Sequence, residues 1–441
     1  MMQSIDIDKS TRQDSGPQRH LGHELRHYWY HVRQFSRNAR LYLLAAFLLG
    51  VNYEFFQLLL NLYLKELGFG ESNIGLINSS RAVGMSLMAI PAAIILSRIN
   101  LKPVLIASGI LFAIFSVGVS SNEPLQLILI FSVLSGMTFA FSRVAAGPFY
   151  MRNSTSEERT HLFSFSFGVL LLAGMVGSLT AGRLVPLMSE LAGDSILGYR
   201  YTLYLGIAIG MLALIPFAML KPTPASDEER RIKVTREQFR RRGTFYFKIS
   251  FSNFLIGLGA GLIIPFLNLY FRDKFGLSTS TIGFFYFCTI LFMFAGTLAG
   301  PVLARRYGLV RTIVFTQLLS IPFMLTLAYT QVLWIAFAAY VLRAGLMNIG
   351  VPVATNFGME MSSRAEQGLV NALLMVSWTS SWMLSTAVGG RLIEQYGYTL
   401  TFNITIVLYI LSTLFYFWSF KGVEKRGDDK AGWAIAEQEE A

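Results

Sequence analysis

One acidic side chain stands in a long apolar run, where a carboxyl group could exchange protons. Of the 26 acidic residues, only Glu54 lies deep within such a run, about eleven residues or roughly 16 Å of helix from Lys65. Gln57 and Asn61 follow on the same helical face. A carboxylate at membrane depth costs about 2.5–3.5 kcal/mol on insertion scales, so it needs a partner or a water-filled cavity. We therefore expect Glu54 to carry a coupled proton or to coordinate a substrate.

Three arginines lie in similar apolar runs. Arg81 can reach the depth of Glu54, and the alternative to a functional Glu54 is a permanent ion pair between these two residues that pins two helices together. Arg343, in the second half of the chain, can bind an anionic group, pair with the first half in one conformation only, or cap buried carbonyls. Arg143 lies near the end of its run and can extend to the membrane surface, which favours a structural role.

Polar and aromatic side chains of other apolar runs complete a predicted binding cavity. Most aromatic residues and methionines of such a chain pack in cores or face lipid, so each candidate competes with a packing role. The predicted substrate-binding residues are Gln57, Asn61, Arg81, Asn253, Asn268, Arg343, Asn348, Asn371, Trp378 and Trp382.

Composition places these residues in a membrane protein. The 441 residues are 53% hydrophobic and 14% charged, with a mean hydropathy of +0.49, which is too apolar for an ordinary soluble protein. Windows of 18 or more residues with almost no charge recur, each long enough to cross a hydrocarbon core of ~30 Å. The predicted twelve spans are 41–64, 74–96, 103–120, 125–149, 161–187, 199–220, 245–271, 280–304, 311–330, 332–357, 367–392 and 398–420.

The basic residues predict how these spans are oriented. With the N-terminus inside the cell, 28 of the 37 Lys and Arg residues fall in cytoplasmic tails and loops, six lie near the outer ends and three lie within spans. Both termini are therefore expected to be cytoplasmic, in the plasma membrane, and the net charge of +11 reflects topology rather than nucleic-acid binding. No signal-peptide pattern opens the chain. Residues 23–35 mix aromatic and basic side chains, which predicts an interfacial helix.

The chain also repeats itself. Asn61-Leu62-Tyr63-Leu64-Lys65 returns as Asn268-Leu269-Tyr270-Phe271-Arg272. At a constant offset of 208, Ile74-Gly75 matches Ile282-Gly283, Arg98 matches Arg306, Glu158 matches Glu366, and Gly182-Arg183-Leu184 matches Gly390-Arg391-Leu392. The fold class is an all-α membrane protein with two parallel six-helix halves and a site between them near the midplane. The domains are a tail (1–40), a first bundle (41–220), a linker with a surface helix (221–244), a second bundle (245–420) and a tail (421–441).

These features resemble the major facilitator superfamily over residues 40 to 420. The loops 93–102 and 301–310 are similar to that family's loop motif: Arg98 and Arg306 occupy its basic position and Gly308 its second glycine, while Ser97, Arg305 and Asn100 replace its acidic residue and first-half glycine. Leu342-Arg343-Ala344-Gly345 resembles the arginine motif of proton-coupled members, although that motif is usual in the fourth span, where Ser135 stands. The fifth span lacks the Gly-Pro step of drug:proton antiporters.

The resemblance implies a secondary transporter that moves a small organic solute by alternating access. The single deep carboxylate, Glu54, favours a proton as the coupling ion, and we expect efflux rather than uptake. Its partners are a small-molecule substrate, a proton and the bilayer, and a monomer is expected. The residues assemble no nucleophile with a base, no metal-ligand cluster and no phosphate loop, so we predict neither an enzyme nor a cofactor. The alternatives are an uptake permease or facilitator, and a non-transporting sensor or scaffold with the same fold.

Overall fold

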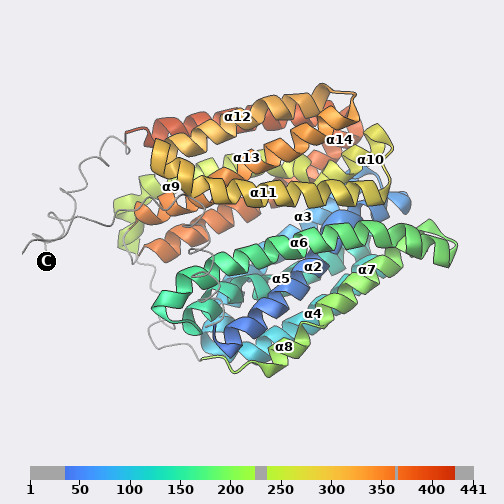
Figure 1. The fold of residues 1–441 in the computed structure, drawn as a ribbon, viewed down its shortest axis with the longest axis horizontal. Coiled ribbons are helices and arrows are strands. Elements are labelled where there is room, and N and C mark those ends of the chain that lie inside the picture. The colour runs from blue at the N-terminus through green and yellow to red at the C-terminus, as the bar shows by residue number, and fades with distance from the viewer. Residues whose placement is uncertain (1–34, 224–235, 363–365, 423–441) are drawn as a thin grey trace, which may run out of the picture.

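The computed structural model describes residues 35–223, 236–362 and 366–422, and within these ranges every regular element is a helix (Figure 1). The predicted interfacial helix at residues 23–35 falls almost wholly outside them. The elements are α2 (Arg37–Glu66), α3 (Glu71–Arg98), α4 (Leu101–Ser121), α5 (Leu125–Arg152), α6 (Ser156–Ala192), α7 (Ser195–Met211), α8 (Leu214–Met219), α9 (Arg236–Ile263), the short 3-10 helix η1 (Ile264–Phe266), α10 (Leu267–Phe275), α11 (Thr279–Tyr307), α12 (Leu309–Tyr329), α13 (Leu333–Glu360) and α14 (Gln367–Phe420).

Eleven helical stretches in the described residues are long and apolar enough to cross a membrane, and the last of them holds two spans. A straight helix of the 54 residues of α14 would be about 81 Å long, more than twice the ~30 Å hydrocarbon core. Gly397 breaks it, with φ 78° and ψ 176°, a backbone conformation that favours glycine. Glu366 before α14 and Phe420 at its end both contact the start of α9, so α14 is a hairpin. The predicted twelve spans are thus consistent with the structure.

The two predicted bundles are present as two bodies in Figure 1, with α2–α8 in one and α9–α14 in the other. One apolar cluster lies inside each bundle, and a third joins both of them. α9 starts at Arg236, inside the stretch 221–244 that was predicted to be a linker with a surface helix. α2 likewise starts at Arg37, a few residues before the predicted first span.

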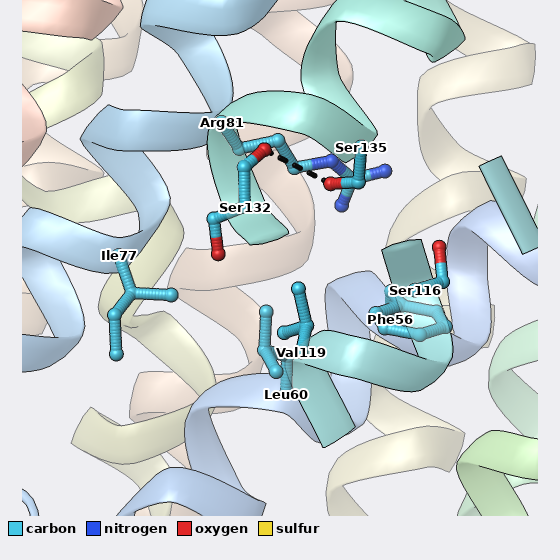
Figure 2. A pocket seen from close by; sticks show the side chains of 8 residues that line it. All are labelled: Phe56, Leu60, Ile77, Arg81, Ser116, Val119, Ser132 and Ser135. Atoms are coloured by element: carbon cyan, nitrogen blue, oxygen red, sulfur yellow. Dashed lines mark hydrogen bonds between the residues drawn. The ribbon is translucent and has the colours of Figure 1, made fainter. Parts of the chain in front are cut away.

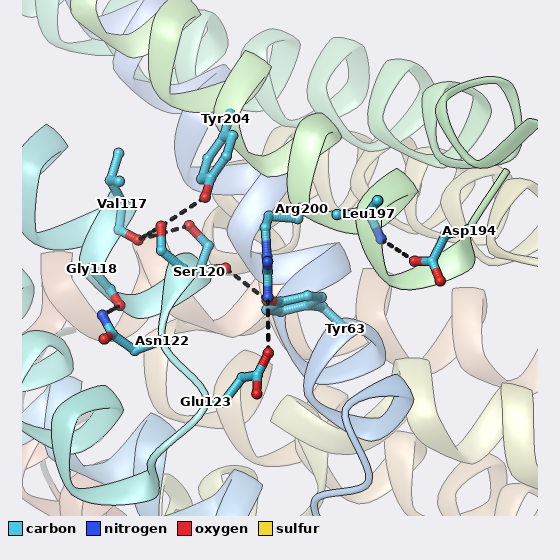
Figure 3. Close-up of polar contacts among 11 residues, drawn as sticks. Tyr63, Val117, Gly118, Ser120, Asn122, Glu123, Asp194, Leu197, Arg200 and Tyr204 are labelled. Atoms are coloured by element: carbon cyan, nitrogen blue, oxygen red, sulfur yellow. Dashed lines mark hydrogen bonds and ion pairs between the residues drawn. The ribbon is translucent and has the colours of Figure 1, made fainter. Parts of the chain in front are cut away.

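The sequence repeat is also a repeat of contacts. The Tyr63 hydroxyl donates to the carbonyl of Ser120 at 2.7 Å (Figure 3), and the Tyr270 hydroxyl donates to the carbonyl of Leu327 at 2.6 Å. Tyr270 follows Tyr63 by 207 residues, and Leu327 follows Ser120 by the same number. In the first half, Arg200 also donates to the Tyr63 hydroxyl at 3.1 Å. The two halves therefore share internal hydrogen bonding as well as helix order.

The halves meet along two helix pairs, α3 with α14 and α6 with α11. A Cβ added to Gly75 would lie 3.1 Å from Cα of Gly390, and one added to Gly182 would lie 3.0 Å from Cα of Gly283. These four glycines are the ones that mark the sequence repeat. They are needed because two helix backbones approach each other too closely for a side chain.

Further bonds join the halves at one end of the molecule, which we call the clasped end. Tyr199 and Thr279 are hydrogen-bonded through their hydroxyls at 2.5 Å, and Arg272 forms an ion pair with Glu66. The backbone N–H of Ser72 donates to Glu394 at 2.7 Å. The opposite end, where α2 begins and α14 ends, is the terminal end. Polar contacts near this end include pairs within one half, such as Asn38 with Asn153 and Arg242 with Glu366.

Candidate functional site

Glu54 lies on α2 at the boundary between the halves and is 8% exposed. Its side chain packs on α6, where a Cβ added to Gly177 would lie only 2.7 Å from Cβ of Glu54. A Cβ added to Gly174 would lie 3.7 Å from its Oε2 and 3.0 Å from Ile290 of α11. The small residues of α6 thus make room for the carboxyl group, and the second half covers it.

Two tyrosines of the second half lie in the neighbourhood of this carboxyl group. The Tyr286 hydroxyl on α11 and the Tyr340 hydroxyl on α13 both lie within electrostatic range of Glu54. Their ring centroids are 6.2 Å apart, and Tyr340 is 5% exposed. Among the described residues, Glu54 itself has no ion pair and no hydrogen bond. Its proton is therefore not committed to a structural partner in this conformation.

Arg343 is the buried cation of the second half, at 5% exposure on α13. It donates from Nη2 to the hydroxyl of Tyr409 at 2.8 Å and lies 5.8 Å from that ring's centroid. Its Nε is buried without a hydrogen-bond partner. Tyr340 lies one helical turn before it and within its electrostatic range. Glu54 and Arg343 thus border the same tyrosine from opposite halves, and neither has a charged partner among the described residues.

Arg81 points away from this boundary. Its guanidinium lies 5.4 Å from the ring centroid of Tyr53 and 5.5 Å from that of Phe139, inside the first half. Tyr53 and Phe56 occupy the face of α2 that turns toward Arg81, whereas Glu54 occupies the face that turns toward α6. The ion pair between Glu54 and Arg81 that the sequence offered as an alternative is absent from this conformation, because α2 separates the two groups.

Asparagine side chains link α2 to the interrupted seventh span. Asn61 donates to the carbonyl of Pro265 at 2.5 Å, and Asn268 donates to the carbonyl of Leu58 at 2.8 Å. Asn78 of α3 donates to Asn61 at 2.8 Å. Because η1 interrupts the helix at Pro265, a backbone carbonyl there is free to accept a bond from the other half. We call Asn61, Asn78 and Asn268 the amide clasp.

The remaining predicted contacts do not converge on Glu54. Asn253 donates to the carbonyl of Leu374 at 2.8 Å and Asn348 to that of Ala344 at 2.9 Å, so both amides are used inside the second half. Asn371 and Trp378 are exposed, while Gln57 and Trp382 are half-buried. The rings of Trp378 and Trp382 are 5.8 Å apart, and the Nε1 of Trp382 is buried without a partner.

The predicted loop residues lie at the terminal end. Arg98 is exposed in the last turn of α3, and Arg306 is exposed at 5.4 Å from the ring centroid of Tyr307. Gly308 ends α11 and begins α12 with a φ of 89°, so the tight turn between the two spans explains this glycine.

Sequence reasoning missed Tyr286, Tyr340, Tyr409 and Asn78. The chain holds 19 tyrosines, and no local pattern separates those beside Glu54 from those in the core. Tyr340 stands three residues before Arg343, so a search for aromatic residues one turn from a buried charge would have found it.

Comparisons with known proteins identify the family of this chain. The model of the Major Facilitator Superfamily matches residues 42–251 and 249–437, which together span nearly all of the chain that crosses the membrane. The protein belongs to the major facilitator superfamily, a family of membrane transporters. It is a multi-pass membrane protein, as its helices require.

The chain is similar to an uncharacterized MFS-type transporter, YfkL, of Bacillus subtilis (strain 168), with 28% identity over 173 residues. That match spans 37% of this chain and 40% of the relative. Among solved structures, a bacterial homolog of the human lysosomal transporter Spinster, inward-facing and unoccupied, has a TM-score of 0.73 at 16% identity, covering 87% of this chain and 96% of that one. A D-xylose–proton symporter has a TM-score of 0.68 at 14% identity, covering 88% and 97%. These structures share the fold.

Proposed function

We propose that this protein is a secondary active transporter in which Glu54 carries a coupled proton. The observation that carries the proposal is the position of Glu54: buried, unpaired among the described residues, and covered by the half that must move away from it. A carboxyl group in this position changes its surroundings whenever the halves rock, so its affinity for a proton changes with the conformation. That change is the requirement for coupling.

We further propose that the solute is a small, weakly anionic or amphiphilic organic compound, exported from the cell. Arg343 supplies a buried positive charge on the half opposite Glu54, and the rings of Tyr340 and Tyr409 supply apolar contacts nearby. The excess of basic residues at the terminal end supports cytoplasmic termini in the plasma membrane. With that orientation, the clasped end is the outer end and the conformation faces inward.

The test separates exchange of solute from coupling to protons. Purified protein is screened for thermal stabilisation by organic acids, nucleosides, sugars, cationic drugs and lysolipids, and each stabilising solute is then followed in liposomes. Glu54→Gln, which resembles the protonated carboxyl group, should retain solute counterflow and lose accumulation driven by a pH gradient. Glu190→Gln, at an exposed position of α6, is the matched control. Unchanged accumulation in Glu54→Gln would return Glu54 to a structural role.

The direction of transport follows from the same liposomes. For proton exchange, solute should enter the liposomes when their lumen is acidic, and release of protons from the lumen should be visible with a trapped pH dye. Accumulation with the opposite gradient would identify proton-coupled uptake instead. Binding without any flux would contradict the proposal that this chain is a transporter, although it would not change the description of the fold.

A further inference from the structure

A small cavity lies inside the first half, away from Glu54 (Figure 2). Four helices of one bundle form its wall, and no described residue of the second half lines it. The lining residues are Phe56 and Leu60 of α2, Ile77 and Arg81 of α3, Ser116 and Val119 of α4, and Ser132 and Ser135 of α5.

Among the described residues that line the cavity, Arg81 is the one with a formal charge. Its Nη2 is buried without a hydrogen-bond partner, and among the described residues no acidic side chain pairs with it. The rings of Tyr53 and Phe139 are in cation–π range of its guanidinium. These contacts stabilise a cation without neutralising it, so the cavity keeps a net positive charge and a free donor.

Serine hydroxyls add further donors around the same space. Ser116, Ser132 and Ser135 are 2%, 2% and 4% exposed. Ser135 donates to the carbonyl of Ser132 at 3.0 Å, which leaves its oxygen beside the guanidinium in Figure 2. A hydroxyl hydrogen can rotate toward an incoming acceptor. One guanidinium and three hydroxyls around a small space form a donor set that suits a single compact anion.

The wall of the cavity is rigid because α3 and α5 are in backbone contact. A Cβ added to Gly84 would lie 2.9 Å from the carbonyl carbon of Val133, and one added to Gly136 would lie 3.0 Å from the carbonyl carbon of Arg81. Both positions need glycine for this close approach. The cavity is therefore fixed within one half and does not depend on how the halves are arranged.

We propose that this cavity is an anion-binding site for one small, singly charged group, either a free halide or the carboxylate of a short organic acid. The charge comes from Arg81, orientation comes from Ser132 and Ser135, and Phe56, Leu60, Ile77 and Val119 limit the size. The proposal does not rest on the transport function, since binding within one rigid half requires neither a gradient nor flux.

The test measures thermal unfolding of the purified full-length protein at constant ionic strength, with sodium gluconate replaced by chloride, bromide or acetate. The wild type should gain stability along a saturable curve, because a ligand of the folded state stabilises by mass action. Arg81→Gln should lose the effect. Ser135→Ala keeps the charge and should raise the apparent Kd about tenfold, the equivalent of one hydrogen bond to a charged group.

Arg183→Gln, at an exposed position on α6, is the control and should match the wild type. Saturation by chloride and bromide alone supports a halide site, and stronger saturation by acetate supports a carboxylate site. A wild type that responds equally to all three anions and to gluconate overturns the proposal. If Arg81→Gln does not fold, an unchanged Kd in Ser135→Ala overturns it as well.

Discussion

The two halves of this protein use the same helices and place different side chains on them. At the step of 208 residues, Arg81 corresponds to Thr289 and Ser135 corresponds to Arg343. The helix pair α3 and α5 of the first half is equivalent to the pair α11 and α13 of the second. Each pair holds one arginine at these positions, on α3 in the first half and on α13 in the second. Ser132, which lines the cavity of the first half, corresponds to Tyr340, whose large side chain is buried beside Arg343 in the second. The duplication preserved the backbone while the buried charges diverged.

The boundary around Glu54 shows the same exchange of large and small residues. Glu54 corresponds to Gly261 at the step of 207, and Gly177 corresponds to Ser385 at the step of 208. In the first half the carboxylate on the first helix faces a glycine. In the second half a glycine faces the serine, where an added Cβ would lie 3.3 Å from Cβ of Ser385. At this contact, only the first half therefore carries a side chain that can bind a proton.

The largest expected effect is on stability at this exchanged contact. Gly177→Leu should destabilise the fold by about 3 kcal/mol or prevent folding, because its Cβ would already lie 2.7 Å from Cβ of Glu54. Gly168→Leu on the same helix is the control, since an added Cβ there meets nothing within 4 Å. Yield of monodisperse protein and the melting temperature measure both. Equal behaviour of the two variants would contradict the packing described here.

The second largest effect is expected when a residue of the second half is introduced at the equivalent position of the first half. Ser132→Tyr introduces the residue that the second half carries at this place and should fill the cavity beside Arg81. The apparent Kd for the anion should rise at least about tenfold, while counterflow of solute continues. Thr180→Tyr, at an exposed position, controls for the added ring. Anion stabilisation that survives Ser132→Tyr would place the ligand elsewhere.

A smaller effect is expected from the amide clasp. Asn268→Ala removes the donor to the Leu58 carbonyl and should favour opening of the clasped end by about 1 kcal/mol, a fivefold change in population. Spectroscopic distances between labels on the loops after α2 and α10 report the shift, in a background with Cys288→Ser. Asn348→Ala, whose amide serves only its own helix, should leave those distances unchanged.

The smallest effect is expected for the hydrogen bond between the Ser72 N–H and Glu394 at the clasped end. Glu394→Gln weakens the bond from the Ser72 N–H, and Glu394 is exposed, so the change should be below about 0.5 kcal/mol. The same labels should show almost no shift in population. A shift as large as that of Asn268→Ala would mean that the bond between Ser72 and Glu394 holds the halves together as strongly as the amide clasp does.

The sequence was sufficient for the architecture and for the position of Glu54. Long apolar runs and a repeat at fixed spacing depend only on bilayer thickness and duplication, so both can be recognised without coordinates. The direction in which each charge points could not be predicted. Arg81 and Glu54 have similar depths, and only the rotation of α2 shows that they face different neighbours. The tyrosines beside Glu54 come from α11 and α13, whose approach to α2 depends on tertiary packing.

The interruption at Pro265 has a consequence for solvent and isotope exchange. Its carbonyl accepts a bond from Asn61 only while the halves are in contact at the clasped end. When they separate, that bond must be replaced by water, because a buried carbonyl left without a partner is costly. Water is thereby admitted to the non-helical turn between α9 and α10. Deuterium should then enter the amides of Phe266 to Leu269 at a rate that follows each opening of the molecule, so exchange at the break in the helix measures how often the two halves separate.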